Sequence, residues 1–383
     1  MSEPRTDEES PRAAPRAEEA PALPWVPHWW IARLALDLRR FLLRLAARIL
    51  PPHAALFELA TGGMVAAMLQ RCVVLGIPDL LERGPLSADD LAEQTGSHPD
   101  RLHRVLRACV SSGVFTLRSD GRFANNYLSR ALRSGVPGSF RDPLDYFTSP
   151  EIARVWGGLP AALDEAVGGY EQEYGQPVWD WYEDHPQERA RVARSMTALS
   201  ALDAVAVARS WPFGSLRCLG DVGGGQGVVL AEILRRNPAL RGMIVDSAGV
   251  VGLARGFLAD RGLLHRVDLR EGDFFDEVPR GCDGLLLKNI LHDWDDPSAL
   301  AILKVCRSAL QTGQPLLVVE MVQEPHAADR VASLSDVHMM IATVRGRERS
   351  REELESLLVE AGFRPVRFCR LPGVQCLLEG RAE

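Results

Sequence analysis

The sequence lacks paired cysteines, a long uncharged apolar run and an excess of positive charge. Its seven cysteines contain no Cys-x-x-Cys pair, which predicts a reducing compartment and no structural zinc site. No run of about 18 or more uncharged apolar residues occurs, and residues 1–24 lack the apolar core of a secretory signal. We therefore expect a cytoplasmic protein without a membrane span. The formal net charge of -7 argues against binding nucleic acid through bulk electrostatics, although a local basic stripe could still do so.

What the sequence contains is the composition of a soluble globular protein, with 46% hydrophobic and 25% charged residues. Its 383 residues exceed what one ordinary core requires, which predicts two domains. Residues 1–27 are rich in Pro, Glu, Arg and Ala and are expected to be disordered. We divide the rest into a helical and winged-helix domain (28–139), a helical linker that contributes to a ligand pocket (140–215), and an α/β domain (216–383).

Residues 28–50, HWWIARLALDLRRFLLRLAARIL, are expected to form an amphipathic helix. The segment carries five arginines, and its apolar side chains recur at helical spacing. Those on one side are Trp30, Leu34, Leu38, Leu42, Leu45 and Ile49. The favoured interpretation is a helix that packs on its own protein or on a partner subunit. The alternative is a basic helix that lies on a membrane surface.

A winged-helix module is predicted after an apolar helical region that starts at residue 53 and requires a core or an interface to cover it. Ser87 can cap a helix that ends at Gly96, a second helix follows, and Asp120-Gly121 is a strong hairpin signal. Such modules bind DNA in some proteins, and basic residues of the second helix are Arg101, His103, Arg104 and Arg107. The acidic net charge and the large α/β portion favour a dimerisation or packing platform instead.

Aromatic residues are concentrated in the mainly helical pattern between residues 140 and 215. They are Tyr146, Phe147, Trp156, Tyr170, Tyr174, Trp179, Trp181 and Tyr182. At helical spacing such residues usually pack in a core, but between two domains they could also line an apolar cavity.

From residue 216 onward, short apolar runs alternate with helical segments, which predicts a doubly wound parallel sheet. The expected strands are LRCLGDV, RGMIVD, VDLREGD, CDGLLLK and PLLVVEMV. The last segment, around Pro372-Gly373, predicts an antiparallel hairpin that closes the sheet. Ligands of such sheets bind beyond the carboxyl ends of the strands.

The first expected strand runs into a glycine-rich turn, DVGGGQG, that opens a helix. The turn lacks the third glycine of a GxGxxG fingerprint, so a dinucleotide phosphate site is disfavoured. Asp221 would oppose a pyrophosphate but suits an ammonium group, and Asp246 at the next strand end can hold ribose hydroxyls. Asp273 and Phe274, which follow the third strand, can contact an adenine by hydrogen bonding and packing. Together these residues indicate a nucleoside that bears an amino acid, which is S-adenosylmethionine.

From about residue 54 to the C-terminus the chain resembles the plant-type O-methyltransferase family, including its bacterial members that modify secondary metabolites. The matching parts are the winged-helix region and the segments DVGGGQG, EGDFF, LKNILHDWDD, LLVVEMV and RGRERSREELESLLVEAGF. The resemblance implies a homodimer with a helical dimerisation domain, a Rossmann-like class I methyltransferase domain, S-adenosylmethionine as cofactor and a small-molecule acceptor. The segment VDSAGV departs from the family's Asp-Leu-Pro, and the arginine-rich N-terminal extension lies outside the family's core.

The resemblance also implies roles for particular residues. His292 matches the family's general base, with Glu320 and Glu348 holding its imidazole and Asp293 beside it. The implied cofactor contacts are Asp221, Gly223, Gly225, Asp246, Asp273, Phe274 and Lys288. Candidates for a substrate wall, with core packing as the alternative, are Met196, Met339 and Met340.

The expected reaction is methylation of a hydroxyl, here a phenolic one, on a small secondary metabolite. A phenol has a pKa near 10, so a histidine that titrates near neutrality can accept its proton. No metal is expected, because the His and Asp residues lack a ligand pattern. The alternatives are a relative that uses the same cofactor for hydroxylation, decarboxylation or cyclisation, a cofactor-sensing DNA regulator, and a scaffold with an inactive site. Glu320 and Glu348 could instead be structural acids paired with arginines.

Overall fold

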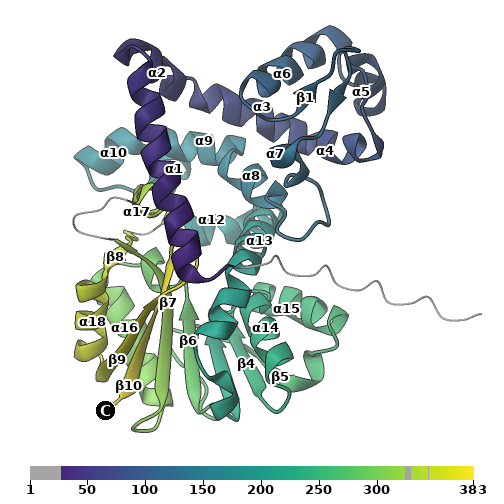
Figure 1. The fold of residues 1–383 in the computed structure, drawn as a ribbon. Coiled ribbons are helices and arrows are strands. Elements are labelled where there is room, and N and C mark those ends of the chain that lie inside the picture. Colours follow the sequence, from purple (N-terminus) through teal and green to yellow (C-terminus); the bar gives the residue numbers. More distant parts are fainter. Residues whose placement is uncertain (1–26, 324–328, 344) are drawn as a thin grey trace, which may run out of the picture.

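A computed structural model describes residues 27–323, 329–343 and 345–383. A helical region lies above a sheet flanked by helices, and α1 (Trp29–Ile49) crosses from one to the other (Figure 1). The predicted disorder of residues 1–27 falls almost entirely outside the described residues. The proposed domain boundaries at residues 139 and 215 stay predictions.

The sheet is doubly wound, as the alternation of apolar runs and helices predicted. Its strands, in spatial order, are β5 (Val267–Glu271), β4 (Arg241–Asp246), β3 (Cys218–Val222), β6 (Gly284–Lys288), β7 (Pro315–Gln323), β10 (Gln375–Ala382) and β9 (Phe363–Arg370), with β8 (Arg349–Ser350) beside β7. The first five are parallel, and β10 runs antiparallel to both its neighbours. All five predicted strands and the closing hairpin are confirmed.

Each central strand is buried on both faces because helices cover both sides of the sheet. On β6, Leu286 packs into one core cluster, whereas Leu285 and Leu287 pack into the other. The first cluster also contains residues of α13 (Pro186–Ser210), α14 (Val228–Arg236) and α15 (Ala248–Asp260), and the second contains residues of α16 (Asp296–Ala309) and α18 (Arg351–Glu360). Strands with two buried faces are apolar throughout, which explains why the sequence revealed them so clearly.

The predicted winged helix is confirmed. Its elements are α5 (Ala88–Thr95), α6 (Pro99–Ser111), β1 (Thr116–Leu117) and β2 (Phe123–Ala124), preceded by α2 (Pro52–Ala60), α3 (Gly62–Val74) and α4 (Ile77–Leu80). Ser87 caps α5 in a capping box with Asp90, and Gly96 ends it in a left-handed conformation, at φ 65°. The two short strands pair across the Asp120-Gly121 turn.

The first half of the apolar region that starts at residue 53 is not covered within one copy of the chain. Leu56, Phe57, Leu59 and Met64 are 64–69% exposed. Among the described residues, the stretch Pro52–Val74 is long and apolar enough to cross a membrane, by length and composition alone. It contains Glu58 and Arg71, which is why no uncharged run was found in the sequence. The first half of the region therefore needs an interface to cover it, whereas Cys72 and Val73 of the second half are buried in the core of the winged-helix domain.

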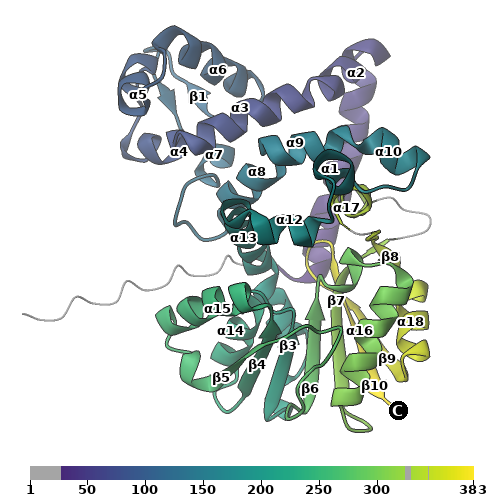
Figure 2. The same ribbon diagram turned by 180° about the vertical axis from the view of Figure 1, so that it is seen from behind.

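The helices between the winged helix and the sheet lie over the carboxyl edge of the sheet (Figure 2). They are α7 (Tyr127–Arg130), α8 (Arg141–Phe147), α9 (Pro150–Gly157), α10 (Leu159–Asp164), α11 (Gly169–Tyr174) and α12 (Val178–Asp184), and α17 (Arg330–Ala342) packs among them. Tyr170, Trp181 and Tyr182 are buried in a cluster that Ile341 of α17 completes. Much of the aromatic segment is thus core, as its helical spacing indicated.

A disulfide joins Cys218 at the start of β3 to Cys282 just before the neighbouring strand β6. The two cysteines lie 64 positions apart in sequence, so no local signal indicated this pair. The absence of a Cys-x-x-Cys pair was the basis for predicting a reducing compartment, and it did not exclude a disulfide between neighbouring strands.

Candidate functional site

The candidate cofactor and catalytic residues gather at one edge of the sheet. Asp221, Asp246, Lys288 and Glu320 lie at or near the carboxyl ends of the parallel strands β3, β4, β6 and β7. Parallel strands end at the same edge, so residues far apart in sequence become neighbours there.

The glycine-rich turn after β3 needs its glycines for conformation and for space. Gly223 and Gly225 have φ of 67° and 57°, in the left-handed region that favours glycine. A Cβ atom on Gly224 would lie 2.7 Å from the Asp221 carboxyl carbon, and one on Gly223 would collide with Ile290. The turn therefore leaves its backbone open to a close ligand only while these positions remain glycine.

Asp221 is a buried carboxylate without a hydrogen-bonding partner in the described part of the chain. Burial raises its pKa to about 7, with a further increase from Asp246 and a partial offset from Lys288. A buried negative charge is costly unless a cation accompanies it. The site therefore suits an ammonium group placed against Asp221.

The other predicted cofactor residues lie around the turn in different ways. The Asp246 carboxylate accepts N–H bonds from Gly225 at 2.9 Å and Ser247 at 2.8 Å. Phe274 lies against Gly223, whereas Asp273 is exposed and accepts the N–H of Phe275 at 2.8 Å. The turn thus brings together the Asp246 and Phe274 side chains, and Asp273 shapes the loop beside them.

Lys288 is held by a residue that sequence reasoning missed. Its ammonium lies 3.6 Å from the Asp203 carboxylate and 3.5 Å from the Ser200 hydroxyl, both on α13. Asp203 lies 85 residues before Lys288, in a helix whose sequence shows no motif, so only the packing of α13 on the sheet reveals the pair.

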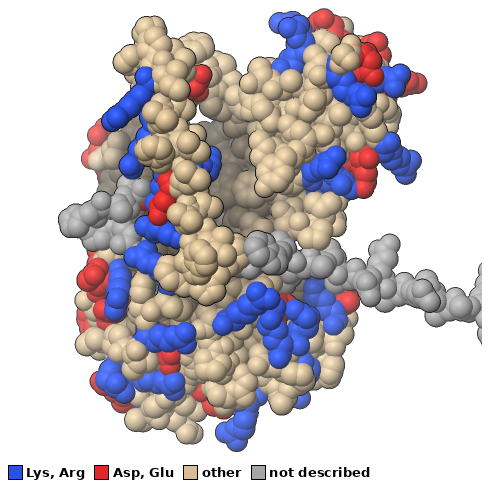
Figure 3. Space-filling view, in the orientation of Figure 1, with Lys and Arg blue, Asp and Glu red and all other residues tan. Residues whose placement is uncertain are grey.

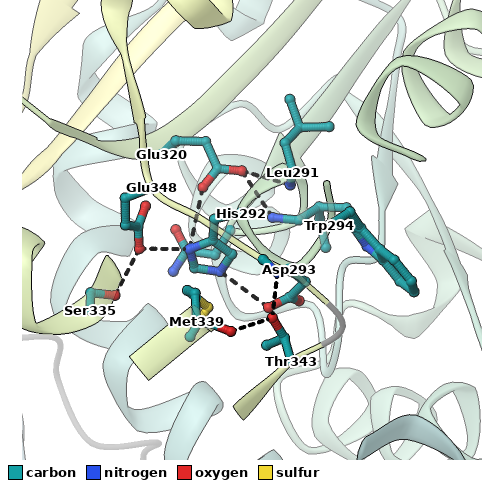
Figure 4. A network of polar contacts seen from close by, with 12 residues as sticks. Leu291, His292, Asp293, Trp294, Glu320, Ser335, Met339, Thr343 and Glu348 are labelled. Carbon is teal, nitrogen blue, oxygen red and sulfur yellow. Dashed lines mark hydrogen bonds and ion pairs between the residues drawn. The ribbon is translucent and has the colours of Figure 1, made fainter. Parts of the chain in front are cut away.

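His292 occupies a single helical turn, Leu291–Asp293, that follows β6. Its Nδ1 lies 2.9 Å from Glu348 Oε1 and 3.7 Å from Glu320 Oε2, and its Nε2 lies 3.7 Å from Asp293 Oδ1 (Figure 4). The predicted base and all three predicted acids are thus neighbours. Hydrogen bonding of Nδ1 to Glu348 leaves Nε2 as the nitrogen without a hydrogen bond inside the described chain.

The two glutamates are themselves held in place. Glu320 Oε1 accepts the N–H groups of Ile290 at 3.0 Å and Leu291 at 2.9 Å, which ties β7 to the turn that carries His292. The Ser335 hydroxyl of α17 donates to Glu348 Oε1 at 2.7 Å. The interpretation of these acids as arginine-paired structural groups is wrong, because their described partners are His292, backbone N–H groups and Ser335.

The acids change the proton affinity of His292. Burial disfavours its charged form, but the charges of Glu348, Glu320 and Asp293 more than offset that cost and raise the pKa of His292 to about 10. Burial likewise raises the pKa of Glu320 to about 7 and that of Asp293 to about 6, against the lowering effect of His292. The expectation that His292 titrates near neutrality is therefore wrong, since three carboxylates stabilise its imidazolium.

Arg349 holds the turn from the other side, and no motif in the sequence pointed to it. The side chain is fully buried and donates to the carbonyls of Leu291 at 2.6 Å and Trp294 at 2.7 Å, and to Asp296 at 2.8 Å. Two carbonyls that flank His292 are thereby satisfied by one guanidinium, which holds the turn in a single conformation.

His292, Glu320 and Glu348 also have the geometry of a metal site, with ligand atoms within 4.8 Å of one another. The sequence concealed this cluster because its members lie on three separate segments. An imidazolium already balances the same carboxylates, so the geometry by itself does not require a metal. That no metal is used stays a prediction.

The three methionines occupy different surroundings. Met339 on α17 lies beside His292 and Asp293 (Figure 4). Met340 packs against the aromatic cluster, and Met196 on α13 is 39% exposed. Only Met339 is thus placed next to the candidate base.

Two further buried residues lie near the site: His338, which was not selected from the sequence, and Tyr146 of the aromatic segment. His338 on α17 stacks on Trp156 at 6.1 Å between ring centroids and meets Phe147 at 5.5 Å. Burial and the charge of His292 lower the pKa of His338 to about 4, which keeps it neutral. Burial raises the pKa of Tyr146 to about 12, so it stays a neutral hydrogen-bonding group. An aromatic wall with neutral polar groups therefore adjoins the candidate base.

Comparison with known proteins identifies two family regions. The model of an O-methyltransferase domain matches residues 156–364, and that of an O-methyltransferase dimerisation domain matches residues 57–135. Among curated proteins, the chain is 32% identical to the mitomycin biosynthesis 6-O-methyltransferase of Streptomyces lavendulae, over 81% of this chain and 88% of that protein. It is also 32% identical to the 8-amino-8-demethylriboflavin N,N-dimethyltransferase of Streptomyces davaonensis, over 78% of this chain and 86% of that protein.

A solved structure shares most of the fold. It is an O-methyltransferase from neocarzinostatin biosynthesis in complex with S-adenosylmethionine and 2-hydroxy-5-methyl naphthoic acid, and it superimposes with a TM-score of 0.74 at 28% identity. The match covers 98% of that chain and 85% of this one.

Proposed function

Because the chain belongs to the O-methyltransferase family and is an S-adenosylmethionine-dependent enzyme of small secondary metabolites, we propose that it methylates a phenolic hydroxyl with His292 as general base. The observation that carries the proposal is the position of His292, whose Nδ1 is bound by Glu348 while Nε2 stays available at the carboxyl edge of the sheet. The alternative of a non-methylating relative finds no support, since both curated relatives described above are named as methyltransferases.

The residues of the glycine-rich turn fit S-adenosylmethionine, which supplies a methyl group already made electrophilic by its sulfonium. Asp221, buried without a hydrogen-bonding partner in the described chain, would hold the ammonium group. Asp246 would hold the ribose hydroxyls, and Phe274 would pack against the adenine. Gly223 and Gly225 allow the close approach that these contacts need.

The acids around His292 determine how it can act as a base. In the neutral imidazole, Glu348 holds the proton on Nδ1, so that the Nε2 lone pair is free for the acceptor hydroxyl. A pKa of about 10 for His292 matches the pKa of about 10 of a phenol, so the proton transfer between them is close to balanced. Glu320 and Asp293 stabilise the imidazolium that results. The residues thus align a hydroxyl and take up its proton, which is the main task left to the protein.

The aromatic surroundings favour a flat, largely apolar acceptor. Trp156, Phe147 and Met339 lie on the helices that adjoin His292, and His338 offers a neutral polar group among them. An aromatic amine is a second candidate acceptor, because one of the relatives is named as an N,N-dimethyltransferase. For an amine, His292 would remove the proton from the nitrogen after or during transfer.

We also place the enzyme in the cytoplasm. The apolar stretch Pro52–Val74 does not need lipid to cover it. From residue 57 onward it matches the model of the dimerisation domain, so a partner subunit can cover it. The same domain supports a homodimer and gives the winged helix a role without nucleic acid.

The test is transfer of a labelled methyl group from S-adenosylmethionine to matched panels of phenols and anilines, built on naphthalene and benzene rings. We expect label on phenols, and a turnover about 100-fold lower or more in His292→Ala, with unchanged affinity for S-adenosylhomocysteine by calorimetry. His265→Ala, an exposed histidine, is the matched control and should keep full turnover. Unchanged turnover in His292→Ala would remove the residue from the mechanism, and label on anilines alone would favour the second acceptor class.

A further inference from the structure

We propose that an apolar face of α1 is an additional dimer contact, covered by a second copy of this chain. This face, the arm stripe, consists of Trp30, Leu34, Leu38, Phe41, Leu45 and Ile49, which are 50–77% exposed. Their spacing places them on one side of the helix. The arm stripe is far more apolar surface than a soluble protein normally leaves to water.

The helix uses a different face to contact its own subunit. Ala32, Leu36 and Arg40, spaced by four residues, are the half-buried positions of α1. Arg40 forms an ion pair with Asp329, and Trp29 and Arg33 line a small groove together with the loop that joins β9 to β10. Because α1 is already anchored through this inner face, the arm stripe points away from its own subunit.

The arm stripe is continuous with the dimerisation region. Only Leu50 and Pro51 separate α1 from α2, and Phe57, Leu59 and Met64 just beyond are 67–69% exposed. The dimerisation model begins at residue 57, so these exposed apolar side chains lie within the dimerisation domain. Figure 3 shows uncharged surface running from α2 down along α1, beside a hollow between α1 and the winged helix. A partner bound at residue 57 thus has a direct path onto the arm stripe.

The charges on α1 favour a second copy over a lipid surface. A helix on an anionic membrane directs its arginines to the headgroups beside its apolar face. Here two of the five arginines are engaged within the subunit: Arg33 pairs with Asp37 at 3.2 Å, and Arg40 is turned toward Asp329. A second copy related by two-fold symmetry presents the same apolar surface. The arm stripe and the surface that covers it are therefore encoded by the same sequence.

Covering the arm stripe would also act on the site through α17. Asp329, the partner of Arg40, caps α17 by accepting the N–H groups of Val331 at 2.9 Å and Ala332 at 3.3 Å. The same helix carries Ser335, which donates to Glu348. The arm therefore connects the dimer contact to the helix that positions the acid beside His292.

The contact lies outside both family models, which match residues 57–135 and 156–364. The inference therefore concerns a feature of this chain and does not depend on which acceptor the enzyme methylates.

The first experiment measures the dimer dissociation constant of the full-length protein by sedimentation velocity over a dilution series. We expect Leu34→Glu/Leu38→Glu to raise it about tenfold or more, because two charges would enter a dry contact. Leu43→Glu is the control, since Leu43 is 46% exposed but lies about two and a half turns from Leu34, on the opposite side. An equal dissociation constant in all three proteins would overturn the proposal.

A second measurement does not depend on weakening the dimer. At a concentration where the protein is dimeric, maleimide should label Leu38→Cys several-fold more slowly than Leu43→Cys, with the site of labelling read by mass spectrometry. Equal labelling rates would mean that the arm stripe is uncovered and would overturn the proposal. The proposal would also fail under two joint conditions: vesicles containing phosphatidylserine bind the wild type but not Leu34→Glu/Leu38→Glu, and the two proteins have identical dimer dissociation constants.

Discussion

At the scale of single residues, His292 shows charge overcoming burial. An isolated buried histidine loses its proton easily, as His338 does with its pKa lowered to about 4. His292 is equally buried, yet three carboxylates raise its pKa to about 10. The two histidines lie 46 positions apart in sequence and in one neighbourhood of the fold, and their opposite shifts are caused by their different partners.

The first prediction concerns Glu348, the carboxylate nearest to the imidazole. The neutral imidazole is the active base, so the activity of the wild type should rise with pH toward the pKa of about 10. Glu348→Gln removes the charge that raises the pKa of His292 most, so the increase in activity with pH should occur at lower pH than in the wild type. The maximum activity should be smaller, because the imidazole ring is less firmly held. The measurement is kcat/KM between about pH 6 and 10. Glu360→Gln, an exposed position, is the control, and an unmoved alkaline limb in Glu348→Gln would contradict this view of the base.

The second prediction is that Asp221 trades stability for cofactor binding. Its folded-state pKa of about 7 lies above the ordinary value of 3.8 for an aspartate, so its favourable contribution to stability is full below pH 3.8 and is lost as the pH rises through 7. Asp221→Asn should therefore raise the Tm of the free enzyme at about pH 8 and lose that advantage near pH 4. Its affinity for S-adenosylhomocysteine should fall about tenfold or more, since the ammonium loses a charged partner. Thermal melts and calorimetry test both halves, and a lower Tm at pH 8 would argue against an uncompensated charge.

At the scale of elements, the turn after β6 is rigid because backbone groups and buried side chains hold it from two sides. Glu320 accepts two of its N–H groups, and Arg349 donates to the carbonyls of Leu291 and Trp294. The two strands that supply these side chains, β7 and β8, are distant in sequence from the turn. The position of His292 is thus a property of three elements and not of its own segment.

The third prediction follows from that arrangement. Arg349→Ala should lower the free energy of unfolding by about 3 kcal/mol, because it leaves two buried carbonyls without donors. The neighbouring Arg347, 45% exposed and paired with Glu353, is the control, and its loss should cost about 0.5 kcal/mol. Urea unfolding measures the difference. Equal losses for the two arginines would show that the turn does not depend on the buried guanidinium.

At the scale of the whole molecule, the helical region and the sheet enclose the site together. The sheet edge contributes the glycine-rich turn and His292, and the helical region contributes α17 and the aromatic wall. Binding at such a junction couples a ligand to the stability of the complete fold.

The fourth prediction uses that coupling. S-adenosylhomocysteine at about 100 times its Kd should stabilise the wild type by about 2.7 kcal/mol and raise its Tm. Asp246→Ala should show little shift at the same concentration, because the ribose loses its acceptor and the turn loses the contact to Gly225. Differential scanning fluorimetry gives both values. A full shift in Asp246→Ala would place the ribose elsewhere.

Much of this protein could be predicted from the sequence because its signals are local. Doubly buried strands are continuous apolar runs, and the residues at their ends meet at one edge because the strands are parallel. Asp221, Asp246 and His292 were selected in this way, and the winged helix followed from a cap at Ser87 and a turn at Asp120-Gly121.

What only the tertiary structure decided are the properties that arise between distant segments. The pKa of His292 depends on carboxylates 28 and 56 positions away, Lys288 is paired with Asp203, and Arg349 holds a turn more than 50 positions before it. Electrostatic and hydrogen-bond energies depend on distances of a few ångströms, which sequence separation does not encode. The sequence alone determined the architecture and the cofactor and selected His292 as the candidate base, and the folded arrangement decided how strongly His292 holds its proton.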